Sequence, residues 1–193
     1  MMRIITGKAK GIRLDTLPGE NTRPTSEKAK EAIFSTLQFD IPGRRVLDLF
    51  GGSGQMGLEA MSRGADSAMF IDSSPEAMNI IKKNAKKTNF FDMSRFLISD
   101  YRSYIRKAAG KDLYDLIFID PPYADRSVGD ATERILASEI AAEDCIFVLE
   151  SENENVFEKN EHLWDRFNII KQQHYGRAFI NILKLKGNPH NED

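Results

Sequence analysis

The chain has 193 residues, of which 41% are hydrophobic and 29% are charged, and its formal net charge is −2. This composition is ordinary for a globular protein of one domain. No apolar run approaches the roughly 18 residues that a membrane span needs, and the polar N-terminus does not match a secretory signal. The single cysteine, Cys145, cannot form an internal disulfide, so we expect a protein of the reducing cytoplasm.

The charges are unevenly distributed along the chain. Residues 1–14 and residues 171–187 each contain four basic residues and no acid, whereas residues 139–165 contain nine acids and one lysine. Such asymmetry can place a basic face on a nearly neutral protein, although solvated strand faces that happen to be basic explain it equally well. The basic residues of the first segment, called the arm cations below, are Arg3, Lys8, Lys10 and Arg13.

The N-terminal part of the chain predicts a hairpin and a helix, which precede the alternating strands and helices of the rest of the chain. Residues 1–14 predict a hairpin-like arm of two short strands. After an irregular stretch, a helix should begin near Thr25 or Ser26, either of which can cap its first turn. Apolar residues at helical spacing give this helix one buried face, and Pro42-Gly43 ends the unit.

From residue 44 onward, strands and helices alternate. The predicted helices run from the glycine-rich turn to Gly64, from Pro75 to about Lys87 and near 131–140, and residues 151–165 predict a loop with a short helix. The predicted strands are 45–50, 67–71, 95–99, 114–119, 145–150, about 166–173 and about 177–186.

The alternation predicts an α/β fold with a doubly wound, Rossmann-like parallel sheet. Only His174-Tyr175-Gly176 separates the last two strands, which leaves no room for a crossover helix, so these strands must pair antiparallel. We divide the chain into a hairpin arm over 1–22, an α/β domain over 23–187 and a tail over 188–193.

A glycine-rich turn follows the first strand of the sheet. Gly52-Ser53-Gly54-Gln55-Met56-Gly57 matches the G-x-G-x-x-G pattern, and Asp72 lies twenty residues after Gly52. Glycine lets the backbone approach a ligand, and an acid at the end of the second strand can bind ribose hydroxyls. Every adenosine-containing cofactor shares these needs, so the turn leaves a nicotinamide cofactor and S-adenosylmethionine both open.

Three further features favour S-adenosylmethionine. Asp48 lies inside the first strand, where a buried carboxylate needs partners, and an ammonium-bearing ligand could be one of them. Asp100 follows the third strand, where it could reach an adenine amino group. The tetrad Asp120-Pro121-Pro122-Tyr123 closes a buried strand and has no role in hydride transfer.

The tetrad suits a flat amine. The lone pair of an exocyclic base amine is delocalised into the ring, and acceptors that hold both N–H bonds favour the localised, nucleophilic form. Asp120 and the Pro121 carbonyl can be these acceptors, and Tyr123 offers a ring for stacking. A simple turn after a buried strand is the alternative explanation. Together with the glycine-rich turn, the tetrad predicts methylation of a nucleic-acid base without a metal or a covalent nucleophile.

A base must leave its stack to enter such a slot. The arm cations, with Arg23, are our candidates for holding the backbone phosphates of the substrate. The alternative is an edge hairpin that only closes the sheet.

The motifs follow one another in an order that is similar to that of a known family. Met2-Arg3-Ile4-Ile5-Thr6-Gly7-Lys8 and Thr22-Arg23-Pro24-Thr25 precede the glycine-rich turn, which is followed by Glu59–Ala65, the tetrad and Tyr175-Gly176. Over nearly its whole length the chain resembles the bacterial small-subunit ribosomal RNA guanine-N2 methyltransferases of the RsmD type. The turn and the tetrad occur widely among amino-methyltransferases, and the two N-terminal segments narrow the resemblance to this family.

The resemblance implies a seven-stranded class I methyltransferase fold with an N-terminal hairpin that touches RNA. It implies S-adenosylmethionine as the donor and, as the acceptor, the N2 amine of a flipped guanine of 16S rRNA in the small subunit or its assembly intermediate. We expect a monomer without metal or membrane contact. The chain departs from the family at Gly52, where alanine is usual, at Gln55, which replaces a small residue, and at Asp72, which replaces the commoner glutamate.

Other functions remain open at this point. A DNA adenine-N6 methyltransferase uses the same tetrad, but it usually needs a separate target-recognition region for which 193 residues leave little room. A non-catalytic binding module and an oxidoreductase are further alternatives.

The predicted site residues form three groups. Catalysis is assigned to Asp120, Pro121, Pro122 and Tyr123. RNA binding is assigned to the arm cations Arg3, Lys8, Lys10 and Arg13 and to Arg177. Cofactor binding is assigned to Asp48, Phe50, Gly51, Gly52, Ser53, Gly54, Asp72, Ser73, Asp100, Tyr101, Arg23 and Thr25.

Overall fold

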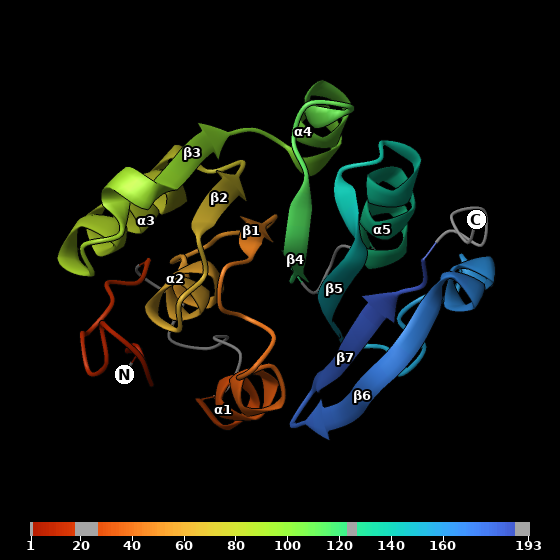
Figure 1. Cartoon of the computed structure of the whole chain (residues 1–193), viewed down its shortest axis with the longest axis horizontal. Coiled ribbons are helices and arrows are strands. Elements are labelled where there is room, and N and C mark those ends of the chain that lie inside the picture. The colour runs from red at the N-terminus through yellow and green to blue at the C-terminus, as the bar shows by residue number, and fades with distance from the viewer. Residues whose placement is uncertain (1, 18–26, 123–126, 188–193) are drawn as a thin grey trace.

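A seven-stranded sheet forms the centre of the computed structural model, which describes residues 2–17, 27–122 and 127–187 (Figure 1). The strand order is β3-β2-β1-β4-β5-β7-β6, in which β1 to β5 are parallel and β7 pairs antiparallel with both β5 and β6. This arrangement confirms the predicted fold class. The strands are β1 (Arg45–Asp48), β2 (Ser67–Asp72), β3 (Ser94–Ile98), β4 (Tyr114–Ile119), β5 (Ala141–Ser151), β6 (Phe167–Tyr175) and β7 (Ala178–Leu185).

Two hydrophobic clusters lie on opposite faces of the sheet. Successive residues of a strand point to opposite faces, so Val46 of β1 joins one cluster and Leu47 the other. Helices cover both faces, which explains why the central strands are almost entirely apolar. The first cluster includes residues of α1 (Glu27–Thr36), α2 (Gln55–Ser62) and α3 (Pro75–Lys87), and the second includes residues of α4 (Tyr101–Ala108), α5 (Ser127–Ala137) and the 3₁₀ helix η3 (Glu161–Arg166).

Local sequence signals account for α3 in full. The Ser74 side chain accepts a hydrogen bond from the Ala77 N–H at 3.2 Å, and Pro75 occupies the first helical position. The last turn carries Lys86 and Lys87, whose charges favour the C-terminal end of the helix dipole. The observed helix has the predicted limits.

Helix α4 was not predicted. It has only eight residues, and Tyr and Ser are not strong helix formers. Its buried face carries Tyr104, whose hydroxyl hydrogen-bonds to that of Tyr114 on β4. A helix this short is stabilised by tertiary packing more than by its own propensity, which is why its sequence alone gave a weak signal.

Several boundaries also differ from the prediction. β1 ends at Asp48 rather than at residue 50, and β5 begins at Ala141, four residues before the predicted start. The extra length of β5 comes from the pairing of Ala141 with Tyr114, beyond an irregularity in the register. α5 begins at Ser127 rather than near 131, and the residues of its first turn are buried. β6 continues to Tyr175 instead of ending near 173.

The N-terminal hairpin forms, but its strands amount to one isolated antiparallel bridge between Arg3 and Arg13. The Ile4 N–H donates to the Ile12 carbonyl at 3.0 Å. Ile4, Ala9 and Leu14 are buried in the same cluster as α1 and α2. The hairpin is therefore packed into the core by its apolar residues. Residues 22, 23 and 188 lie outside the described ranges, so the division into an arm, a domain and a tail stays a prediction.

A buried acid anchors this hairpin to α2. Glu59 has no solvent exposure, and its two carboxylate oxygens accept hydrogen bonds from the Ile5 N–H at 2.7 Å and the Thr6 N–H at 3.0 Å. Lys30 is 2% exposed. It donates to the Arg3 carbonyl at 2.6 Å and lies 3.6 Å from the Glu59 carboxylate.

In the described part of the chain, no helix has the length and apolar content that a membrane crossing needs.

Candidate active site

Acidic residues stand at the ends of four parallel strands. Asp48 is the last residue of β1, Asp72 is the last of β2, Asp120 directly follows β4, and Glu150 is the penultimate residue of β5. The chain order of the sheet reverses between β1 and β4, which are neighbours. Ligands of open α/β sheets bind outside the carboxyl ends of the strands at such a switch point. The four acids therefore surround the place where a ligand is expected.

The glycine-rich turn after β1 is packed closely against β2 and α3. The Gly51 N–H donates to the Ile71 carbonyl at 2.8 Å, and a Cβ added to Gly51 would lie 2.7 Å from the Ile81 side chain. Gly52 and Gly54 have φ values of 55° and 79°, in the left-handed region that favours glycine. The turn leaves no space for side chains on its inner side.

The third glycine of the pattern has a separate role. Gly57 lies in the first turn of α2, and a Cβ at this position would be 2.4 Å from the Phe70 ring on β2. Its N–H donates to the Asp48 carboxylate at 3.0 Å. Glycine thus allows the close contact of helix and strand and supplies a backbone donor to the buried acid.

The buried carboxyl group of Asp48 titrates near neutral pH. The residue is 4% exposed, and burial raises the pKa of its carboxyl group to about 7, with a smaller upward contribution from the charge of Asp72 and a downward one from the Gly57 N–H. A cation placed beside Asp48 would stabilise its charged form. The structure thus buries this acid and bonds it to one backbone amide, while its role in cofactor binding stays a prediction.

Asp72 connects β2 to the glycine-rich turn. One of its carboxylate oxygens accepts from the Gly52 N–H and the other from the Ser74 N–H, both at 2.8 Å. These two bonds fix the carboxylate plane, and each oxygen keeps a further lone pair. Ser73, beside it, is exposed, while the buried Ser53 donates its hydroxyl to the Met2 sulfur at 2.9 Å.

An aromatic pair stands between the glycine-rich turn and α4. The rings of Phe50 and Tyr101 are 5.4 Å apart at their centroids, and the Tyr101 hydroxyl donates to Asp130 on α5 at 2.7 Å. Asp100 is exposed and caps α4, where its carboxylate accepts from the Ser103 N–H at 2.9 Å. This bond lowers the pKa of Asp100. The cap role was not part of the prediction for Asp100.

Asp120 lies half-buried among other acids. Burial raises the pKa of its carboxyl group well above the usual range, and the charges of Glu150 and Asp48 raise it further. Pro121 is buried and Pro122 is exposed. The remaining predicted site residues Tyr123, Arg23 and Thr25 lie outside the described ranges.

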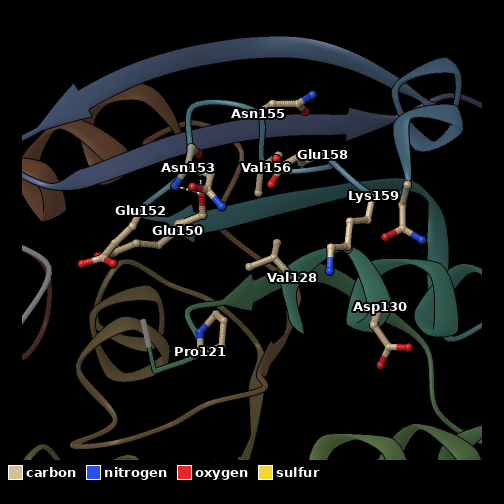
Figure 2. A pocket seen from close by; sticks show the side chains of 13 residues that line it. Pro121, Val128, Asp130, Glu150, Glu152, Asn153, Asn155, Val156, Glu158 and Lys159 are labelled. Atoms are coloured by element: carbon tan, nitrogen blue, oxygen red, sulfur yellow. Dashed lines mark hydrogen bonds between the residues drawn. The ribbon is translucent and has the colours of Figure 1, made fainter. Parts of the chain in front are cut away.

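A cavity of about 280 Å³ opens beside Pro121, between β4, the first turn of α5 and the segment after β5 (Figure 2). Among the described residues, neither Asp120 nor any of residues 48–54 lines it, and its walls lie toward β5 and α5, on the side of β4 away from β1. Its walls are formed by Pro121, Val128, Gly129, Asp130, Glu150, Ser151, Glu152, Asn153, Asn155, Val156, Glu158, Lys159 and Asn160.

Asp130, on the α5 wall of this cavity, is held by two helices. Burial alone would raise the pKa of Asp130, but hydrogen bonds from Arg134, Tyr101 and Arg102 lower it to about 2. The Arg134 side chain donates from the same helix at 2.9 Å, and that of Arg102 from α4 at 3.1 Å. The cavity wall is therefore tied to the helix that follows Asp100.

The predicted RNA-binding residues do not converge on the strand ends. The arm cations are exposed, and Arg3 pairs with Glu27 at 2.9 Å. Arg177 is exposed in the turn between β6 and β7. The described residues provide no contact between these side chains and the acids of the site, so their role in binding RNA stays a prediction.

Sequence reasoning missed Glu150. The signal was available, because Glu150 follows an apolar run at the end of a predicted strand, as Asp72 and Asp120 do. It also missed Asn84, which is buried and whose amide donates to the Ser53 carbonyl and to the Asp15 carbonyl, both at 2.9 Å. No local pattern marks such a contact, because Asp15 and Asn84 are brought together only by folding.

Comparisons with known proteins agree with this geometry. A family model described as conserved hypothetical protein 95 matches residues 2–184. A Bacillus subtilis protein, provisionally named rRNA methyltransferase YlbH, is 33% identical over 96% of this chain and 100% of its own length. Ribosomal RNA small subunit methyltransferase D of Escherichia coli is 28% identical over 80% of this chain and 76% of its own.

A solved structure extends the likeness to the fold. A protein from Escherichia coli, provisionally titled methyltransferase yhhF, has a TM-score of 0.83 and 25% identity, covering 97% of this chain and 99% of that one. The chain therefore belongs to the conserved hypothetical protein 95 family, the family of RsmD-type methyltransferases.

Proposed function

We propose that this methyltransferase transfers a methyl group from S-adenosylmethionine to the exocyclic N2 amine of one guanine in 16S rRNA of the small ribosomal subunit. Ribosomal RNA as the substrate class is supported by the names of its relatives. The observation that carries the proposal is the position of Asp120 and Pro121, with the glycine-rich turn on one side and the cavity on the other.

The donor is S-adenosylmethionine, and the described residues fit it. Asp48 is buried with a pKa near neutrality, so an amino-acid ammonium beside it would stabilise its charge. Asp72 is oriented by two backbone N–H groups and keeps lone pairs for ribose hydroxyls. Bound at this turn, S-adenosylmethionine supplies a methyl group already activated on a sulfonium.

Asp120 and the Pro121 carbonyl act on the acceptor. Each accepts one N–H of the amine, which favours the pyramidal form with a localised lone pair and so acts mainly on the transition state. Holding the amine in line supplies much of the remaining acceleration. Tyr123 stacks on the base. The amine proton leaves after transfer to solvent or to a neighbouring carboxylate.

The hairpin supplies the RNA contact in this proposal. It is fixed to α2 through Glu59, so the exposed arm cations are presented from a rigid support. Their charges would bind phosphates around the flipped nucleotide, with Arg177 as a further contact. The partner is 16S rRNA in the small subunit or its assembly intermediate, and the enzyme acts in the cytoplasm as a monomer.

One experiment tests the proposal directly. The purified protein is incubated with tritiated S-adenosylmethionine and small subunits from cells that lack the enzyme, and the labelled nucleoside is identified after digestion. We expect N2-methylguanosine at one position. Label in N6-methyladenosine would contradict the proposal. Label of duplex DNA in a parallel incubation, with none on the subunits, would favour a DNA adenine methyltransferase.

A further inference from the structure

Four lysines stand on the solvent side of α3, in its last two turns. Between them in the chain lie Asn84 and Ala85, which are buried. The four, called the α3 lysines below, are Lys82, Lys83, Lys86 and Lys87. Residues four apart on a helix are neighbours, so these lysines form two like-charged pairs, which destabilise a helix. A helix face that is only solvated mixes charges of both signs, and this face does not.

Aromatic rings support two of the α3 lysines. The Lys82 ammonium lies 6.0 Å from the centroid of the Phe96 ring, and that of Lys86 lies 5.0 Å from the centroid of the Phe91 ring. The two rings stack on each other with centroids 5.1 Å apart and pack against the core. Within the described ranges, neither lysine forms an ion pair with an acid. Both charges are therefore available to a partner, while contact with the rings limits the side-chain freedom that binding would remove.

Asp15 joins the other two α3 lysines to the N-terminal hairpin. Its carboxylate lies 2.7 Å from the Lys83 ammonium and also accepts from that of Lys87. The Asp15 N–H donates to the side-chain oxygen of Asn84 at 2.8 Å. Asp15 comes two residues after Arg13, which bridges to Arg3 across the hairpin. The exposed arm cations therefore lie next to the α3 lysines.

This combined surface is strongly basic on a chain whose net charge is −2. Residues 2–15 and 82–87 contain eight basic residues and one acid, Asp15. Residues 139–165, which include β5 and most of η3, contain nine acids and one lysine. The hairpin and α3 lie together on the left of Figure 1, and β5 lies on the right beyond β4. Such a separation of charge steers a polyanion toward the hairpin and α3.

We propose that the α3 lysines, together with the adjoining arm cations, form a docking surface for the phosphate backbone of the RNA substrate. This inference rests on the proposed function and deepens it, because it extends the RNA contact from the hairpin to α3. Lys82 follows Pro75, the first residue of α3, by seven residues, which is about 10 Å along a helix axis. The docked phosphates are thus remote from the flipped nucleotide, and the surface serves binding rather than methyl transfer.

A double substitution isolates this surface. Lys82→Gln combined with Lys86→Gln removes two charges but leaves both ion pairs of Asp15 in place. The matched control is Lys107→Gln combined with Lys111→Gln, which removes the same charge at the exposed end of α4, on the opposite face of the sheet. Lys82→Arg combined with Lys86→Arg keeps the charge. Filter binding measures the affinity of each protein for 16S rRNA across a range of salt concentrations. Methyl transfer to small subunits from cells that lack the enzyme gives KM and kcat.

We expect the glutamine pair on α3 to weaken RNA binding. The slope of log affinity against log salt concentration should become shallower by about 0.7 to 1.8, which corresponds to one or two lost phosphate contacts. At 0.1 M salt this change is roughly a 5- to 60-fold loss of affinity, and KM for the subunits should rise to match. kcat and the affinity for S-adenosylmethionine should not change. The arginine pair and the control on α4 should keep the wild-type slope.

The outcomes separate this inference from the proposed function. If the wild type produces N2-methylguanosine and the glutamine pair on α3 keeps the wild-type slope and KM, the α3 lysines are only a solvated face, although the function stands. If the wild type labels a different nucleoside and the glutamine pair still lowers the RNA slope, the docking surface stands and the proposed function is wrong.

Two parallel measurements test other polyanions as the partner. The same proteins are titrated with duplex DNA and are sedimented with phosphatidylserine vesicles. An effect of the glutamine pair on DNA or vesicle binding, with none on RNA binding, would overturn the inference.

Discussion

Asp48 should control the pH dependence of stability in the free protein. Burial raises its pKa from 3.8 to about 7 in the folded state. Between these values the folded protein holds a proton that the unfolded chain has released, so the free energy of unfolding falls as pH rises. The slope is about 1.4 kcal/mol per pH unit for one group, which amounts to about 4 kcal/mol over the whole interval, and it ends above the folded-state pKa.

Asp48→Asn removes this titration while keeping the shape of the side chain and an oxygen that can accept from the Gly57 N–H. The assay is urea unfolding of both proteins at pH 5 and pH 8, without ligand. Other groups titrate alike in the two proteins, so they cancel in the difference. The variant should gain roughly 3 kcal/mol relative to the wild type between pH 5 and pH 8. The same difference at both pH values, within about 0.5 kcal/mol, would show that Asp48 is ionised in the folded protein and would refute the argument.

The same carboxyl group should report on the cofactor. At pH 7 a group with a pKa of about 7 is half protonated, and an ammonium placed beside it lowers that pKa. Binding of S-adenosylmethionine should therefore release about half a proton at pH 7, which calorimetry in buffers of different ionisation enthalpy measures. Asp48→Asn should release none. Equal proton release by both proteins would remove Asp48 from the cofactor site.

Four further predictions remain, of which two concern the acceptor site, one the arm and one the core. In the methyl-transfer assay, Asp120→Asn should lower turnover by roughly 10²- to 10³-fold. Its binding of S-adenosylmethionine, measured by calorimetry, should stay unchanged. Retained turnover would exclude the role assigned to Asp120. Because the pKa of Asp120 is raised, wild-type kcat/KM should fall on acidification at a higher pH than an ordinary aspartate would allow. Replacing the four arm cations by alanine should weaken RNA binding. The slope of log affinity against log salt concentration should become shallower by nearly one unit per lost phosphate contact. An unchanged slope would show that the arm has only a structural role. Gly57→Ala should destabilise the fold by about 1–3 kcal/mol in urea unfolding because its Cβ would meet the Phe70 ring, whereas the control Gly187→Ala, whose Cβ meets nothing, should be neutral.

The sequence identified those elements whose signals are local. Ser74 and Pro75 mark the start of α3 within a few residues of chain, and the observed helix has the predicted limits. The short link between β6 and β7 required an antiparallel pair, which is what forms. The alternation of buried strands and helices was enough for the fold class, because these periodicities are properties of short segments. The acids at the ends of β1, β2 and β4 were visible for the same reason.

Folding decided the features that depend on distant residues. Helix α4 needed the contact between Tyr104 and Tyr114, and the hairpin needed Glu59 to bind its backbone. The pairing of β4 with β5 brings Glu150 next to Asp120, although thirty residues separate them in the chain. No periodicity encodes that register, since it is set by the packing of two whole strands against the helices on both faces. The sequence by itself therefore determined the class of fold and the chemistry of the strand ends, while only the tertiary structure decided which of these acids are neighbours at the edge of the sheet.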